Sequence, residues 1–364
     1  MKKTTILLSA LLAALLGVAE PMDVPFRGGG GLAAGAVRVP GVSEWVMGVC
    51  LDGTTLYVVA GGVLSAFDVR EPLKPKLLGQ LPGMDNNRQV VAQDGFVYVV
   101  SRETGMRIID ARDPKNMRLR SRYDSVEFAT GIDVVGKTAF LSERIYGVEV
   151  VDVSDPDNPA HVCIRKTGES QSNRYRDGYL YSGEWGGGAV EVFDARDLKT
   201  FRPIGHLRLG GFGDGLEIDG DVLYCSTGHD AKHHRAKAVK DRLGANRFLY
   251  TIQQPQSSVY DYGTAAFYVF VEADGTYSRP LALPPVPAFG KGRSARFSGI
   301  PRADGSLVLM TNRSERKAVV WDFTDPENPK ALRAYTLSGN PDLGAFFRGR
   351  AVIPAGHQGL VMER

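Results

Sequence analysis

One short phrase recurs along the chain at a fixed interval. It is an apolar stretch that ends in aspartate, and Asp68, Asp110, Asp152 and Asp194 follow one another 42 residues apart. A second apolar stretch precedes each phrase and is introduced by a turn such as Asp52-Gly53. Asp-Gly between alternating apolar residues is a strong signal for a tight β-hairpin. Each repeat therefore predicts four short strands.

A unit of about 42 residues with four strands is typical of one blade of a β-propeller. The C-terminal piece, residues 341–364, supplies only three strands, and residues 36–41 resemble the fourth strand of the first unit, residues 78–83. We therefore predict an all-β, seven-bladed β-propeller of four-stranded blades, closed by the N-terminal strand joining the last blade. Closure hides the edges of the sheets. Complete units start near Trp45, Asn87, Thr130, Gln171, Asp214 and Arg296.

One copy of the phrase is close to a known repeat. Val150-Val151-Asp152-Val153, followed by Asp155-Pro156, resembles the LVIVD repeat family, a bacterial propeller group. The phrase occurs five times, so the resemblance extends over nearly all of the chain after residue 19. It implies a propeller fold. It implies no particular activity, because that family is defined by its architecture and function depends on the site.

The first segment has the features of a secretory signal peptide. Lys2 and Lys3 precede an apolar run at residues 6–18, and the small residue Ala19 precedes the predicted cleavage point. The run is too short for a comfortable membrane span. We predict a signal peptide at 1–19, a linker at 20–34 and the β-propeller at 35–364. The mature chain is then periplasmic or secreted, without membrane insertion.

Charge and cysteine content narrow the class of partner. The chain has 44 basic and 41 acidic residues. A nearly neutral, exported protein lacks the excess of positive charge that favours binding to nucleic acid. We predict no nucleic-acid partner and a monomeric protein. Cys50, Cys163 and Cys225 lie in apolar strand patterns of separate repeats. They predict buried free thiols and no disulfide framework.

The fifth unit is interrupted between its second and third strands. The insertion covers residues 230–262, in which Asp230 is a good N-cap for a helix over 231–243 and Gly244 a good stop. Insertions into repeat folds often lie on the functional face, so we expect this segment beside the ligand site. The alternative is a surface loop without a role in binding.

Blade geometry places the short Asp-Gly and Asp-Pro turns on one face of the propeller and the variable loops on the other. This variable face carries several arginines and aromatic residues, which favour an anionic ligand whose rings stack on flat side chains. We predict that the ligand is an acidic carbohydrate. The alternatives are another anionic ligand or a protein loop, and Arg-Glu pairs that neutralise one another without a ligand. The predicted ligand-binding residues are Trp45, Arg88, Arg144, Trp185, Asp214 and Arg296.

Two enzymatic alternatives fit the same face. A polysaccharide lyase acting on uronic-acid glycans needs an arginine for the uronate and a base and acid. A glycoside hydrolase needs two opposed carboxyl groups, for which Glu143, Glu184 and Asp214 are candidates. The candidate catalytic residues of the lyase are His229, His357, Tyr146 and Arg174.

No cofactor is predicted. His229 and His233 are weak candidates for binding a divalent metal, because the segment around them lacks a recognised zinc motif with its general-base glutamate. The alternative is a solvated basic helix.

Overall fold

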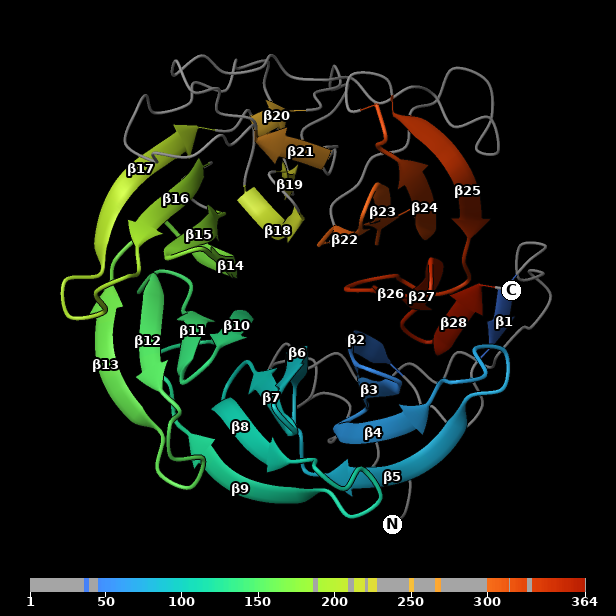
Figure 1. Ribbon diagram of the computed structural model, residues 1–364, viewed down its shortest axis with the longest axis horizontal. Coiled ribbons are helices and arrows are strands. Elements are labelled where there is room, and N and C mark those ends of the chain that lie inside the picture. The colour runs from blue at the N-terminus through green and yellow to red at the C-terminus, as the bar shows by residue number, and fades with distance from the viewer. Residues whose placement is uncertain are drawn as a thin grey trace, which may run out of the picture. The chain divides into compact units, whose positions relative to one another are not determined.

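The structure is a computed structural model in which every described residue belongs to the compact unit Leu32–Arg364 (Figure 1). The described residues are 36–38, 45–185, 189–208, 213–219, 222–227, 249–251, 266–269, 300–313, 315–325 and 329–363. The predicted signal peptide, the predicted linker and the predicted helix over 231–243 lie outside them. Within this part of the chain all regular elements are β-strands.

The described strands form seven four-stranded antiparallel sheets. Three of them are β2 (Val46–Asp52), β3 (Thr55–Ala60), β4 (Val63–Asp68), β5 (Lys76–Pro82); β6 (Asn87–Gln93), β7 (Phe96–Ser101), β8 (Gly105–Asp110), β9 (Arg118–Tyr123); and β10 (Gly131–Val135), β11 (Thr138–Ser142), β12 (Val148–Asp152), β13 (Ala160–Arg165). The next two are β14 (Ser170–Arg176), β15 (Tyr179–Glu184), β16 (Ala189–Asp194), β17 (Arg202–Arg208); and β18 (Gly213–Asp219), β19 (Val222–Thr227), β21 (Ala266–Val269), β20 (Leu249–Thr251). The last two are β22 (Arg302–Asp304), β23 (Leu307–Asn312), β24 (Lys317–Asp322), β25 (Lys330–Thr336); and β26 (Ala345–Phe347), β27 (Arg350–Pro354), β28 (Leu360–Glu363), β1 (Ala36–Arg38).

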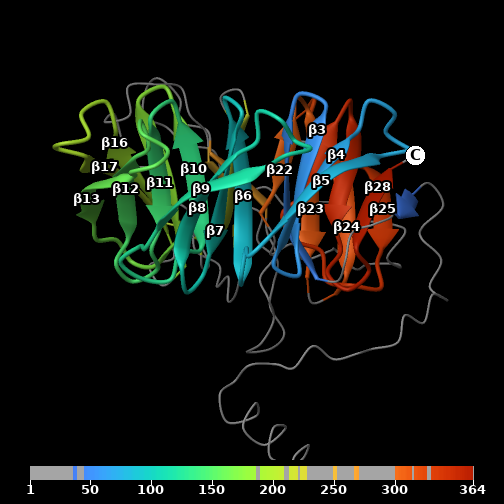
Figure 2. The ribbon, with the colours of Figure 1, turned by 90° about the horizontal axis from the view of Figure 1, so that it is seen from below.

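The hairpin turns lie where the Asp-Gly pairs predict them. Asp52 pairs with Thr55 across the first turn, and Gly53 has a positive φ of 57°. The turn between the third and fourth strands packs on the same end of the sheet: the backbone amide of Val69 donates to the carbonyl of Thr54, at 3.0 Å. The same contact recurs between Ala111 and Gly95, at 2.9 Å. Both short turns therefore lie at the same end of each sheet, and the variable loops lie at the opposite end (Figure 2).

The sheets follow one another around a common centre (Figure 1). The inner strands contact each other in the order β2, β6, β10, β14, β18, β22 and β26, and β26 contacts β2. Apolar side chains fill the space between neighbouring sheets. Val49 and Val58, for example, cluster with Val352 and Met362 of the last sheet. Each large apolar side chain that is fully buried contributes about 1.5–3 kcal/mol.

Two sheets take their outer strand from outside the usual order of the chain, the first of them as predicted. The N-terminal strand β1 pairs with the C-terminal strand β28, with Val37 opposite Met362. In the fifth complete unit, β20 comes from inside the insertion and pairs with β21, although it precedes β21 in the chain. The insertion therefore contributes a strand to its own sheet.

The glycine that opens the third strand is required by close backbone packing. Gly147 has a φ of 96°, and a Cβ at this position would lie 2.1 Å from the carbonyl oxygen of Arg165. Gly105 is in the same situation, with a φ of 68° and the carbonyl oxygen of Tyr123 at 2.2 Å. Any side chain would displace the neighbouring outer strand. This explains why a glycine stands at the same place in successive repeats.

The three cysteines are free thiols. Cys225 is buried, whereas Cys50 and Cys163 are only partly buried, so the prediction of burial holds fully for one of them. Cys50 lies on an inner strand and Cys163 on an outer strand, which separates them across the sheets.

Candidate ligand-binding mouth

The variable loops are tied to the links that enter the next sheet. The amide of Arg102 donates to the carbonyl of Asn86 at 3.0 Å, and the amide of Ser170 donates to the carbonyl of Arg144 at 2.9 Å. The amide of Trp185 donates to the carbonyl of Glu169 at 2.7 Å. These bonds fix the position of each loop at the end of the sheets that carries the variable loops. We call the group of Arg102, Arg144, Arg313 and Asp342 at this end the mouth.

Three arginines from three sheets act on one another at the mouth. The pKa of Arg102 is lowered, first by partial desolvation and then by the guanidinium groups of Arg144 and Arg313. Two of these groups have acidic partners: Arg144 donates to Glu169 at 3.0 Å, and Arg313 lies 3.4 Å from Asp342. Neighbouring like charges repel one another, so the three guanidinium groups together favour a bound anion.

Arg102 is the member of the three whose charge is least compensated. Its side chain is exposed, and its guanidinium forms no hydrogen bond or ion pair with the part of the chain that the structure describes. Glu103 and Asp342 offset the neighbouring arginines only at longer range. A guanidinium in this state is free to form a bidentate bond with a carboxylate or sulfate.

An aromatic pair lies at the same end of the sheets. The ring of Trp45 meets the ring of His357 edge to face, with centroids 4.1 Å apart, and Trp45 is 41% exposed. Trp45 has a φ of 60°, which is unusual for a residue with a bulky side chain. The bond from the amide of Val46 to the carbonyl of Gly356 holds the two segments together. The structure thus joins two residues that the sequence assigned to different roles.

Arg174 lies on the inner strand β14 and is not part of the mouth. It is 7% exposed, and its guanidinium is 3.4 Å from Oε2 of Glu217 and donates to the carbonyl of Asn173 at 2.7 Å. Arg302 also donates to Oε2 of Glu217. The amide of Tyr175, which follows Arg174 in β14, donates to Asp133 of the neighbouring sheet at 2.6 Å. Arg174 therefore belongs to a network of buried and partly buried charges, which we call the charge belt: Asp133, Arg174, Glu217 and Arg302.

The four residues of the charge belt occupy one equivalent position in four successive inner strands. Each stands two residues before the residue that pairs across the hairpin turn. Cys50, Val91 and Ala345 occupy this position in the other three sheets. Negative and positive groups alternate around the belt, which makes each charge a neighbour of an opposite one.

The ionisation of the belt follows from this order. Burial raises the pKa of Asp133. Burial also opposes ionisation of Glu217, but the guanidinium groups of Arg174 and Arg302 outweigh it and lower the pKa of Glu217. Burial and the nearby Arg174 lower the pKa of Arg302. The belt is an internal ion network and has little accessible charge for a ligand.

The carboxyl groups considered for hydrolysis are enclosed. Glu143 is fully buried and Glu184 is 1% exposed. Burial raises the pKa of Glu143 to about 8 and that of Glu184 to about 7. Glu184 accepts from the hydroxyl of Ser182 at 2.8 Å, and Glu143 accepts from the amide of Glu127 at 3.0 Å. Both carboxyl groups hold loops in place, and neither is accessible to a polysaccharide in this structure.

The remaining predicted residues differ in their exposure, and some lie outside the described residues. Arg88 is partly buried in β6, Trp185 is partly buried, and Tyr146 is 49% exposed beside Arg144. The backbone of Asp214 lies in β18. His229, His233 and Arg296 lie outside the described residues. In the described part of the chain no group of three or more His, Cys, Asp or Glu side chains is arranged to hold a metal ion.

Sequence reasoning missed the charge belt, although it named Arg174. The available signal was positional: each belt residue precedes its hairpin turn by the same number of residues. Comparing equivalent positions between repeats, and not the neighbours of one motif, would have found Asp133 and Arg302.

Comparisons with known proteins agree with this architecture. The family model described as LVIVD repeat matches residues 86–125. Hydrazine synthase of Kuenenia stuttgartiensis is similar in structure, with a TM-score of 0.61, 13% sequence identity, and 90% of this chain and 97% of that chain covered. The β-propeller domain of Cps50 (Swd1) from Myceliophteria thermophila has a TM-score of 0.61, 10% identity, and 90% and 97% coverage. BamB from Moraxella catarrhalis has a TM-score of 0.50, 11% identity, and 90% and 95% coverage.

These similarities establish a fold and nothing more, because the identities are low. No curated protein matches the chain in sequence. Among the residues that the structure describes, no helix is long and apolar enough to cross a membrane.

Proposed function

The chain is a β-propeller protein with an LVIVD repeat, and we propose that it is an exported binding protein whose mouth takes an acidic carbohydrate. The proposal includes a closed propeller of seven blades. The seven sheets, the continuous series of inner-strand contacts and the pairing of β1 with β28 support this count. A rigid closed disc is well suited to hold loops from several blades around one ligand.

One observation carries the proposal: the Arg102 guanidinium is exposed, has no hydrogen bond or ion pair with the described residues, and is influenced by two other guanidinium groups. An anion that enters the mouth relieves this repulsion and gains charge-assisted hydrogen bonds. Arg144 and Arg313 already have acidic partners, so Arg102 is the guanidinium that is free to donate hydrogen bonds to the anion. The other two guanidinium groups add to the positive potential around it.

The aromatic side chains favour a sugar as the carrier of the negative charge. Trp45 is held at a defined position by His357, and Tyr146 is half-exposed on the loop that follows Arg144. Aromatic faces present large apolar surfaces on which a sugar ring can stack. Uronate oligosaccharides offer both the ring and the carboxylate.

Binding without catalysis is the function that the geometry supports best. Glu143 and Glu184, two of the three carboxyl groups considered for a hydrolase, are buried. Arg174, a candidate for the lyase reaction, is engaged by Glu217 of the neighbouring inner strand. Arg102 remains available at the mouth as a hydrogen-bond donor to an anion, which suits it to binding a ligand.

Calorimetric titration with oligogalacturonate tests the proposal, with a neutral galactose oligosaccharide of the same length as the comparison ligand. We expect binding of the uronate alone, with an affinity that decreases as salt is added. Arg102→Ala should weaken it at least about ten-fold, which corresponds to a charge-assisted bond of about 1.5–3 kcal/mol. Arg118→Ala, an exposed arginine on the outer strand β9, is the matched control. Equal binding of both oligosaccharides by the wild-type protein would contradict the proposal.

A further inference from the structure

Two buried glutamates make the same contact in successive repeats, at the end of the sheets that carries the mouth. Glu143 is fully buried in the loop between β11 and β12, and Glu184 is buried at the end of β15. Each accepts a hydrogen bond from the backbone amide of a link residue, Glu127 for Glu143 and Glu169 for Glu184. The two link residues lie 42 residues apart, so the contact repeats with the period of the chain. We call Glu143 and Glu184 the loop anchors.

Each loop anchor directly precedes a residue that we predict to bind the ligand. Arg144 follows Glu143, and Trp185 follows Glu184. Arg144 has a φ of 40°, a left-handed conformation that costs free energy in a residue other than glycine. Bonds within the loop, such as that from the amide of Gly147 to the carbonyl of Arg144 at 3.0 Å, maintain this conformation. The position of the Arg144 guanidinium therefore depends on the anchor beside it.

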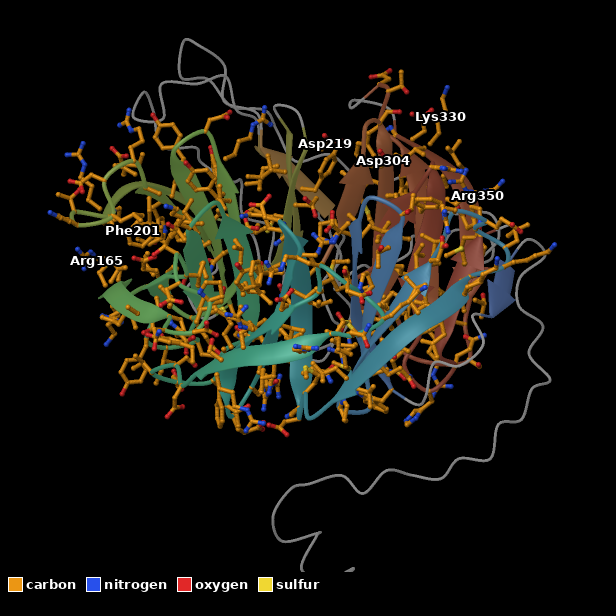
Figure 3. All side chains as sticks on the ribbon, turned by 60° about the horizontal axis from the view of Figure 1, so that its bottom comes forward. Arg165, Phe201, Asp219, Asp304, Lys330 and Arg350 are labelled. Carbon is orange, nitrogen blue, oxygen red and sulfur yellow. The ribbon has the colours of Figure 1, made fainter. Side chains whose placement is uncertain are left out.

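The two anchored loops are bonded to one common link. The guanidinium of Arg144 donates to Oε1 of Glu169 at 3.0 Å, and the amide of Trp185 donates to the carbonyl of Glu169 at 2.7 Å. The link that carries Glu169 begins after Arg165, whose guanidinium donates to the carbonyl of Phe201 in the next sheet at 3.1 Å (Figure 3). Movement of either loop therefore breaks a bond to the same link.

The closed arrangement disfavours ionisation of both loop anchors. Oε1 of Glu143 and Oε2 of Glu184 are buried and have no hydrogen-bond partner of good geometry among the described residues. Burial raises the pKa of Glu143 to about 8 and that of Glu184 to about 7. The hydroxyl groups of Ser125 and Thr167 act in the opposite sense but do not outweigh burial. A carboxylate in this position is costly unless water or an opposite charge reaches it.

The charged groups that face the loop anchors are acidic. After burial, the carboxylates of Glu149 and Glu127 raise the pKa of Glu143 further, and that of Glu191 raises the pKa of Glu184. The titratable side chains that contact these neighbours are Tyr123 and His161 at Glu149 and His206 at Glu191. Loss of a proton from a loop anchor therefore adds repulsion to the cost of burial.

We propose that the mouth is a pH-dependent binding site, which is held closed and competent at acidic pH and is released as pH rises. While Glu143 and Glu184 keep their protons, the loops hold Arg144 and Trp185 in place for the ligand. Loss of a proton favours a conformation in which the carboxylate reaches water, so the loop leaves its link and the strained Arg144 relaxes. This inference rests on the proposed function, because it concerns regulation of the same site.

The direction and the range of the effect follow from proton linkage. The ordinary pKa of a glutamate is 4.5, and the closed loop raises that of Glu143 to about 8. Between these values the closed loop retains a proton that the released loop has lost, so each increase in pH favours release. Ligand affinity should therefore fall as pH rises from about 5 to about 8, and binding within this range should take up protons.

Calorimetric titration with oligogalacturonate at about pH 5.5 and about pH 8, at constant ionic strength, tests this inference. We expect the affinity of the wild-type protein to be about ten-fold or more lower at the higher pH. In the double variant Glu143→Gln with Glu184→Gln, the two affinities should be nearly equal, because glutamine does not titrate. Each single substitution should remove part of the difference. Glu71→Gln, at an exposed position among the short turns, is the matched control and should keep the wild-type difference.

Hydrogen exchange of the ligand-free protein reports release of the loops directly. The amides of Ser170 and Trp185 donate to the carbonyls of Arg144 and Glu169, and both should exchange faster at the higher pH relative to the amide of Val69. Val69 donates to a backbone carbonyl at the opposite end of its sheet, so the ratio removes the direct effect of pH on exchange. In the double variant the ratio should not change with pH.

The two measurements separate this inference from the proposed function. An exchange ratio that is the same at both pH values would overturn the switch, whether or not a ligand binds. A pH-dependent affinity that persists in the double variant would also overturn it and would assign the effect to another group, such as His357. Absence of oligogalacturonate binding at both pH values, with an exchange ratio that changes as expected, would contradict the proposed ligand and leave the switch standing.

Discussion

Arg302 and Glu217 form an ion pair between the inner strands of two neighbouring sheets, although 85 residues separate them in the chain. Arg174 reaches the same carboxylate oxygen from the sheet on the other side. Three inner strands are therefore connected by a single glutamate. The pairing joins the strands before and after the insertion, so residues 230–262 do not interrupt the order of the sheets around the centre.

Removal of Glu217 should destabilise the fold strongly. In Glu217→Gln, the two arginines keep their charges but lose the carboxylate between them, and loss of one partner from a buried pair costs about 3–5 kcal/mol. Urea unfolding followed by fluorescence measures the change. Arg70→Ala removes an arginine from an exposed pair with Asp68 and should have little measurable effect. Equal stability of Glu217→Gln and the wild type would show that the belt does not hold the sheets.

The stability of the protein should decrease as pH rises from about 5 to about 8. Glu143 has a pKa of about 8 in the folded state, above its ordinary value of 4.5. Between these values the folded chain retains a proton that the unfolded chain has released, so each increase in pH favours unfolding. Each unit of pKa difference corresponds to about 1.4 kcal/mol.

Glu143→Gln should flatten this part of the profile, because glutamine does not titrate. Glu184 has a pKa of about 7 and adds a smaller decrease, which remains in the variant. Thermal melting across this pH range is the measurement, with Glu71→Gln, an exposed position, as the control. A wild-type profile that rises through this interval would exclude a protonated Glu143.

Gly147→Ala should destabilise the protein more than Gly53→Ala does. Both glycines have a positive φ, but only at Gly147 does the new Cβ meet a backbone atom, the carbonyl of Arg165 at 2.1 Å. At Gly53 nothing lies within 4 Å of the new carbon. The left-handed conformation alone costs about 1–3 kcal/mol, and the clash at Gly147 adds to it. Comparison of the two free energies of unfolding separates strain from packing.

Deletion of residues 36–38 should leave β28 without its outer neighbour. The deletion removes the pairing of Val37 with Met362 and exposes a strand edge, which favours aggregation and a lower melting temperature. A chain that lacks residues 1–31 but retains this strand is the control. Light scattering during heating should report earlier aggregation for the deletion alone, and unchanged scattering would contradict closure by β1.

The repeat unit was predictable from the sequence because its signals are local. The apolar alternation ending at Asp110 or Asp152 and the Asp-Gly turns specify hairpins from residues that are near one another in the chain. The family match at residues 86–125 and the β-propeller neighbours confirm that interpretation. Pairing of the chain ends was also predictable, because residues 36–41 have the pattern of an outer strand that the last unit lacks.

The roles of individual charged residues depended on the tertiary structure. Arg174 and Arg102 are both arginines, but the guanidinium of Arg174 pairs with Glu217, whereas that of Arg102 has no ion pair with the described residues and lies at the mouth. Their difference comes from depth along the strand and from residues contributed by other repeats. Likewise, the sequence alone does not reveal whether the carboxyl group of Glu143 is exposed or buried beneath a loop.

The sequence by itself determined the period, the strands and the turns of this protein, since these arise from backbone conformation and from the alternation of side chains within about 42 residues. The tertiary structure alone decided which charges meet, because Asp133, Arg174, Glu217 and Arg302 become neighbours only when four inner strands stand side by side. Electrostatic energies depend on distance and burial, and both quantities are set by the assembly of the sheets around their common centre.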